Sequence, residues 1–166
     1  SAGGEKLFPH QGQARSVVMG RYASSDVMGN SNIDSVIIGH RASVSAGSNS
    51  GIVSIGESAG YNAQTNSKSV FIGTGAGSGV QNSTNVICIG EEAGENGNDI
   101  DGSIVIGTKA RSITRNNIYI GSNAGSLLQG SGNIEIVAGT NADNEVNGLA
   151  SASDNMVNIA GVITAD

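Results

Sequence analysis

The chain has 166 residues and a formal net charge of −6, and only Lys109, Arg111 and Arg115 lie close together among its 8 basic residues. This distribution argues against binding to a phosphate backbone, so nucleic acid is not an expected partner. Only 3% of the residues are aromatic and 13% are charged, with 26 glycines and 1 proline. The composition excludes a large aromatic core, a highly charged disordered chain and a collagen helix, and it favours a slim β-rich structure.

The amino-terminal segment and the single cysteine add further limits. Residues 1–15 show no basic start followed by an apolar stretch, so we expect a lead-in or tag remnant rather than a secretory signal, and we interpret the chain as a fragment. No apolar run is long enough for a membrane-spanning helix. Cys88 stands alone, so one chain holds neither a disulfide nor a multi-cysteine metal site, and we expect a small buried apolar residue.

From Ser16 onward, an Ile-Gly-x-x-Ala motif recurs with minor variants. The spacing of its glycines is nearly regular, and an alanine follows each glycine three positions later. The differences between successive glycine numbers are 19, 17, 17, 17, 17, 14 and 18. Such a period is typical of a solenoid in which each repeat forms one turn of a coil. The glycines are Gly20, Gly39, Gly56, Gly73, Gly90, Gly107, Gly121 and Gly139.

Each glycine is preceded by a strand-like pair of aliphatic residues, one and three positions earlier. Residues two apart in a strand point to the same face, and β-branched residues favour strands. We therefore predict that these pairs point into the coil and form its core. The predicted coil core contains Val36, Ile38, Val53, Ile55, Val70, Ile72, Ile87, Ile89, Ile104, Ile106, Ile118 and Ile120.

The position between the members of each pair points to the opposite face. It is apolar or aromatic in seven of the eight repeats, Ser54 being the exception. A strand that is apolar on both faces is normally buried on both, so the pattern predicts association with identical neighbours, although it does not set their number. We place this face on a trimer axis, with Val18, Ile37, Phe71, Cys88, Val105 and Tyr119 along it.

The rest of each repeat is rich in Asn, Ser, Gly and Thr, which favour turns. One weakly apolar residue usually interrupts it, and we interpret this residue as part of a second short strand that closes the coil. The residues concerned are Val44, Ala63, Val80, Ile113, Leu127 and Val146.

The units Ser69–Gly77 and Asn117–Gly125 resemble the N-[VT]-x-I-G-x-x-A-G repeats of bacteriophage tail fibres. They are also similar to the S-V-A-I-G units of YadA-like heads in trimeric autotransporter adhesins. The resemblance covers about 16–142. It implies an all-β fold, a trimeric left-handed parallel β-roll, or β-solenoid, with about eight coils of roughly 17 residues, one coil for each repeat.

Two features favour the phage branch of this resemblance. Adhesin heads mostly use shorter repeats, with few large residues at the middle position of the strand. Here an interval of 17 dominates, and Phe71 and Tyr119 occupy that middle position. Residues 155–166 also look like the end of a tail-fibre body before a cleavable trimerisation chaperone. The interval from Gly139 to Gly161 is longer than any interval before it, which marks a change of structure. We therefore expect a repeat domain over 16–142 and a cap or transition segment over 143–166.

Two enzymatic alternatives are less favoured. The hexapeptide acyltransferases need three hexads per coil, whereas here the hexad occurs once per repeat. Their catalytic base would be His40 or His10, yet His40 occupies a variable turn position and is better explained as a solvated residue.

A polysaccharide-degrading tailspike would use paired carboxylates. The cluster of Glu91, Glu92, Glu95, Asp99 and Asp101 could hold Ca²⁺ but lacks a calcium-motif spacing, which favours a solvated acidic loop.

The resemblance implies a non-enzymatic structural and host-receptor-binding module of a phage tail fibre, which acts by multivalent adhesion. The expected location is the virion tail fibre, or the bacterial cell surface if the chain is an adhesin head. Expected partners are two further copies of the chain, neighbouring fibre segments, and a bacterial surface glycan or outer-membrane protein. No catalytic residue, metal or cofactor is predicted. The candidate surface contacts for a ligand are Tyr22, His40, Arg41 and Tyr61.

Overall fold

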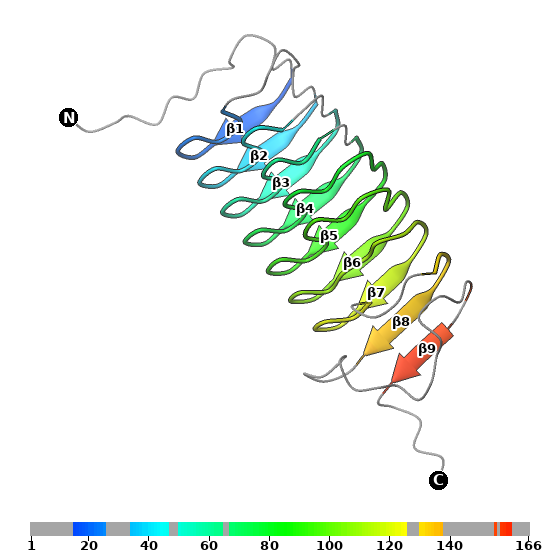
Figure 1. The fold of residues 1–166 in the computed structure, drawn as a ribbon. Helices are drawn as coiled ribbons and strands as arrows, with labels where there is room; N and C mark the ends of the chain where they lie inside the picture. Colours follow the sequence, from blue (N-terminus) through cyan, green and yellow to red (C-terminus); the bar gives the residue numbers. More distant parts are fainter. Residues whose placement is uncertain are drawn as a thin grey trace, which may run out of the picture.

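The computed structural model describes residues 15–25, 34–46, 50–64, 67–125, 130–137, 155 and 157–160. These residues form nine short strands in one parallel sheet, whose order in the sheet follows their order in the chain. Figure 1 shows the strands stacked side by side with their arrows in the same direction, and with β1 and β9 at opposite ends. The predicted all-β parallel solenoid is confirmed. The strands are β1 (Val17–Met19), β2 (Val36–Ile38), β3 (Val53–Ile55), β4 (Val70–Ile72), β5 (Ile87–Ile89), β6 (Ile104–Ile106), β7 (Ile118–Ile120), β8 (Ile134–Val137) and β9 (Val157–Ala160).

Each strand from β1 to β6 pairs with the next in the register that the repeat predicts. Phe71, for example, lies opposite Ser54 on β3 and Cys88 on β5. Outside the strands, isolated bridges join neighbouring coils, such as those between Ser50, Ser67 and Thr84. Backbone hydrogen bonds also join the turns of neighbouring coils, such as the one that the Gly60 N–H donates to the Ala76 carbonyl. No helix able to cross a membrane occurs among the residues that the structure describes.

The predicted second strand of each coil is therefore reduced to single bridges. Val44, Ala63 and Val80 still point into the coil, where they are buried, whereas Ile113 is exposed. Leu127 and Val146 lie outside the described residues.

The eighth repeat has a register that the motif did not predict. Alignment on Gly139 would pair Ile118 with Ile136, but β7 and β8 place Ile118 opposite Ile134. A shift of two positions keeps the alternation of faces, so the hydrophobic pattern could not detect it. The sheet then continues to β9, beyond the expected end of the repeat domain, while the boundary between 142 and 143 lies outside the described residues.

The two faces of the sheet are exchanged relative to the prediction. The middle residue of each strand from β2 to β7 is buried inside the coil, and the two residues beside it are only partly buried. The proposed trimer-axis residues Ile37, Phe71, Cys88, Val105 and Tyr119 are thus core residues, with Val18 packed at the end of this column. The reason is geometric: the chain turns toward the side of the strand on which the central side chain lies, so the coil closes around that side chain and leaves the two flanking ones outside.

The predicted coil-core residues consequently lie on the outer face of the sheet. The strands place them beside the inward-pointing residue, and each retains partial exposure to solvent. The residues to which this correction applies are Val36, Ile38, Val53, Ile55, Val70, Ile72, Ile87, Ile89, Ile104, Ile106, Ile118 and Ile120.

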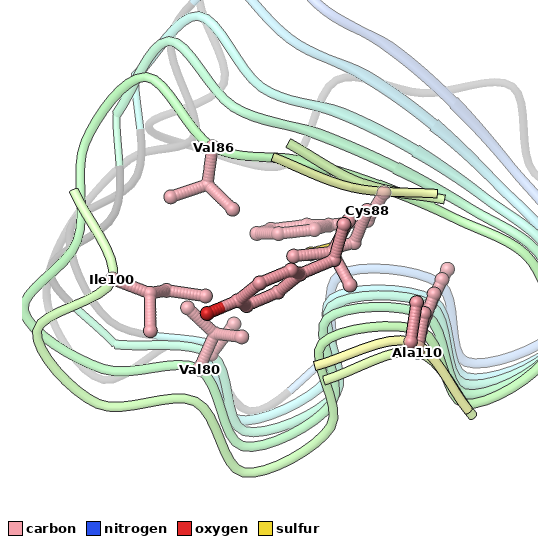
Figure 2. Close-up of a cluster of buried hydrophobic side chains, with 13 residues drawn as sticks. Val80, Val86, Cys88, Ile100 and Ala110 are labelled. Atoms are coloured by element: carbon pink, nitrogen blue, oxygen red, sulfur yellow. The ribbon is translucent and has the colours of Figure 1, made fainter. Parts of the chain in front are cut away.

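The coil interior is filled by matching large residues of the strands with small residues of the turns. Val80, Val86, Cys88, Ile100 and Ala110 point toward the inside of the coil outline in Figure 2. A Cβ atom on Gly77 would overlap the ring of Phe71, and one on Gly125 would overlap Tyr119. The polar Ser54 is accommodated by the turn of the preceding coil, where the Ser43 hydroxyl donates to the Ser54 Oγ at 3.0 Å. A polar side chain inside the coil is thus hydrogen-bonded.

The glycine that ends each strand allows the coils to stack at their corner. Gly73 has a φ of +128°, and a Cβ atom there would lie 2.5 Å from the carbonyl oxygen of Gly90 in the next coil. Both the backbone conformation and the lack of space require glycine. This requirement explains why the motif that reveals the repeat is centred on a glycine.

Candidate interaction surfaces

The outer face of the sheet carries two columns of apolar side chains, which we call the outer strip. All of them are Val, Ile or Met, with no polar side chain among them, and they are most exposed near the two ends, where Val17 is 51% and Val157 is 66% exposed. The outer strip consists of Val17, Met19, Val36, Ile38, Val53, Ile55, Val70, Ile72, Ile87, Ile89, Ile104, Ile106, Ile118, Ile120, Ile134, Ile136, Val157 and Ile159.

The outer strip is large for a surface in contact with water. Nine strands spaced about 4.8 Å apart make it about 38 Å long, and two side-chain columns make it about 12 Å wide. The resulting area, on the order of 450 Å², lies in the range in which the largest apolar patch of a monomer is often functional. The outer strip, rather than the opposite face, is therefore the candidate surface for association between copies of the chain.

A second surface lies on the turns that follow the first three strands, and we call it the aromatic edge. It contains all four predicted ligand contacts, Tyr22, His40, Arg41 and Tyr61. The Arg21 Cζ lies 4.8 Å from the ring centroid of Tyr22, and the Arg41 Cζ lies 5.4 Å from that of Tyr61. Each tyrosine thus has a guanidinium group over its ring, an arrangement stabilised by cation–π attraction.

His40 connects the members of the aromatic edge. Its ring centroid lies 6.1 Å from that of Tyr22, and its Nδ1 lies 3.4 Å from the Glu57 Oε1. The backbone brings these turns together, because the Arg41 N–H donates to the Arg21 carbonyl and the Ser58 N–H donates to that of His40. Four residues that the sequence named separately therefore form one continuous surface.

The sequence analysis missed two members of the aromatic edge, Arg21 and Glu57. Both directly follow the strand-ending glycine, as His40 does. Since equivalent positions of successive coils stack about 4.8 Å apart, aligning the repeats would have placed all three side chains in one column.

A third surface is an open depression of about 340 Å³ on the turns of later coils. Its walls carry both charges, and the Lys109 Nζ lies 3.8 Å from the Glu92 Oε2. The depression is lined by Glu92, Glu95, Asn96, Lys109 and Arg111. Opposite charges face each other across it, so it offers no net field for a charged ligand.

Two further residues of the predicted acidic cluster, Asp99 and Asp101, contact side chains and backbone of neighbouring coils. Arg115 lies 3.7 Å from Asp99 and 3.6 Å from Asp101. The Asp101 Oδ1 also accepts from the Thr84 N–H at 2.6 Å. Among the described residues, no group of three or more His, Cys, Asp or Glu side chains is arranged to hold a metal ion.

Two ionisable groups of the coil interior are kept neutral by burial. Burial raises the pKa of the Cys88 thiol to about 12, and it also raises the pKa of Tyr119 to about 12. A thiol reacts as a thiolate, so the burial of Cys88 and its raised pKa both lower its reactivity at neutral pH. Of the two histidines considered as catalytic bases, His40 lies exposed on the aromatic edge, and His10 lies outside the described residues.

Comparison of the chain with protein-family models, curated proteins and solved structures finds no match.

Proposed function

We propose that the chain is a non-enzymatic structural module of a bacteriophage tail fibre, that it assembles as a homotrimer of left-handed coils, and that it takes part in attachment to the host surface. The observation that carries this proposal is the outer strip. Apolar burial contributes roughly 25 cal/mol per Å², so a strip without polar side chains along the whole sheet strongly favours association.

The shape of the outer strip suits a closed assembly around one axis. It is only two side chains wide, so three copies can enclose it completely, each column packing against one column of a neighbour. A standard interface covers about 800 Å² per partner, which exceeds the area of the outer strip, so the flanking turns must also contribute. The repeat units Ser69–Gly77 and Asn117–Gly125, which resemble fibre repeats, favour three copies over two.

In this proposal the turns, rather than the sheet, face the host. Neighbouring fibre segments adjoin the ends of the coil stack. The aromatic edge is the candidate contact with a bacterial glycan or outer-membrane protein. Three copies on one rigid fibre would raise avidity through effective concentration even if each contact is weak. The virion is then the location of the protein.

The head of a bacterial trimeric adhesin is the second candidate, because the same strip and turns would serve it equally. A binding measurement with the purified protein separates the two candidates. Binding to bacterial cells favours the tail-fibre module, and binding to animal tissue or its matrix favours the adhesin head. The described side chains give the enzymatic alternatives no support. In the open depression on the later coils, acidic and basic side chains such as Glu92 and Lys109 neutralise one another.

The assembly is tested by light scattering coupled to size-exclusion chromatography. The expected mass is three times the chain mass of 16.5 kDa. A stable monomer at micromolar concentration would contradict the proposal. Release of sugars from bacterial surface polysaccharide by the purified protein would overturn its non-enzymatic part.

A further inference from the structure

The aromatic edge combines two chemical properties that are found together nowhere else on the described surface. Tyr22 and Tyr61 are two of the three tyrosines in the chain, and the third, Tyr119, is buried in the coil. Tyr22 is 54% exposed, and each of the two surface rings has an arginine over it. Tyrosine rings at a surface present flat apolar faces with a polar tip, which suits stacking against the C–H face of a sugar.

The charge of this edge is opposite to that of the protein. The chain carries a net charge of −6, whereas the aromatic edge contains two arginines, Arg21 and Arg41, and a single carboxylate, that of Glu57. Guanidinium groups bind carboxylates through paired N–H donors. A local positive charge on an acidic protein favours a ligand that carries carboxylates.

The turn position shared by Tyr22 and Arg41 accepts side chains of many kinds. Their φ angles of +60° and +58° lie in the left-handed region, which recurs at this position in the later coils. The residues there are Ser58, Gly75, Glu92, Lys109 and Asn123. The fold therefore does not need tyrosine or arginine at this position, and substitutions there can test binding without unfolding the coil.

We propose that the aromatic edge binds an acidic glycan, a proposal that deepens the attachment function and rests on it. Tyr22 and Tyr61 stack against sugar rings, and Arg21 and Arg41 pair with the sugar carboxylates. His40 and Glu57 exchange hydrogen bonds with hydroxyl groups. The two tyrosines are two coils apart, or about 10 Å along the sheet, so the edge accommodates more than one sugar ring.

The test is an array of oligosaccharides that contain uronic or sialic acids, printed beside the same oligosaccharides with their carboxyl groups reduced to alcohols. We expect the intact protein to bind acidic members and to bind their reduced counterparts at least tenfold more weakly. Binding to none of the acidic members, or equal binding to both forms, would overturn the proposal.

The variants Tyr22→Asn and Arg41→Asn locate the site. Asparagine already fills this position as Asn123, so both variants should keep the fold and the melting temperature. Each should weaken binding to the best acidic glycan at least tenfold. The control is Lys109→Asn, which removes a cation from the same turn position of a distant coil and should leave binding unchanged. Equal binding by all three variants would contradict the assignment.

Two further measurements separate this inference from the attachment function. Light scattering of the same variants reports assembly, which the aromatic edge should not affect. Whole-cell binding that persists in Tyr22→Asn and Arg41→Asn would leave the attachment function intact and overturn the glycan site. Undiminished binding of the protein to cells stripped of acidic polysaccharide would show that it uses another receptor, and it would also overturn the glycan site.

Discussion

The two faces of the sheet differ in a way that reverses the usual pattern of a folded protein. The inner face tolerates polar residues, because Ser54 bonds with Ser43, and the buried Glu135 accepts from the Gly125 N–H at 2.6 Å. The outer strip contains no polar side chain. A surface in contact with water has no need to be free of polar side chains. This difference between the two faces of the sheet is the basis of our proposal that other copies of the chain cover the outer strip.

The difference also shows how the coil is stabilised. Its interior is too narrow for more than one large side chain per strand, so small turn residues such as Gly77 and Ala110 complete the packing. A single coil of this size buries too little apolar surface to offset the backbone entropy of roughly 1–2 kcal/mol per residue. Stacking of the coils in the sheet buries further surface, and the proposed association through the outer strip would bury more.

The largest expected effect comes from a charge on the inner face. Phe71→Asp would place a carboxylate at a fully buried position, and we expect loss of folded protein, with Phe71→Ala costing about 3–5 kcal/mol. Circular dichroism during thermal unfolding measures both. Ser54→Ala, at the neighbouring inner position, is the control and should cost about 1 kcal/mol. A well-folded Phe71→Asp variant would mean that this face is not the core.

The corner between coils should be nearly as sensitive. Gly73→Ala introduces a Cβ atom 2.5 Å from a backbone oxygen of the next coil, so we expect a loss of about 2–4 kcal/mol in denaturant unfolding. Gly75→Ala is the matched control, because its Cβ atom would meet nothing closer than 3.5 Å and it would bear only the cost of a positive φ, about 1–2 kcal/mol. Equal losses would show that the stacking contact is unimportant.

A charge on the outer strip should act on assembly rather than on the coil. Ile72→Asp combined with Ile89→Asp should convert the oligomer to monomers, as measured by light scattering, while the β-type circular dichroism spectrum is kept at low temperature. Thr74→Asp, an exposed turn residue of the same coil, should leave the mass unchanged. An oligomer that survives the double substitution would remove the outer strip from the interface.

The smallest effect concerns the neutral groups of the inner face. The Cys88 pKa rises from an ordinary 9.0 to about 12 on folding, and that of Tyr119 rises from 10.0 to about 12. Their contribution to stability is therefore complete below about pH 9 and declines as the pH rises toward 12. Cys88→Ala should weaken this decline. A thiol reagent at pH 8 should modify Cys88 only after unfolding, and rapid modification of the native protein would contradict its burial.

Repeat alignment predicted much of the fold and part of the candidate site. The period, the strand position and the glycine corner were all visible in the sequence, because stacking of similar coils requires the same residue types at the same places. Tyr22, His40, Arg41 and Tyr61 were named, yet their association with Arg21 and Glu57 appears only when neighbouring coils are placed side by side. The shifted register of β8 could not be predicted, because it preserves the alternation of faces.

Sequence alternation established that the strand has two apolar faces in seven of the eight repeats, and it predicted that both faces are buried. It could not tell which face lies inside, because Ile72 and Phe71 are both apolar and a period of two treats the faces alike. The direction in which the chain turns after each strand decides this question. The turns close the coil around Phe71, Cys88 and Tyr119, and they leave the aliphatic pairs outside.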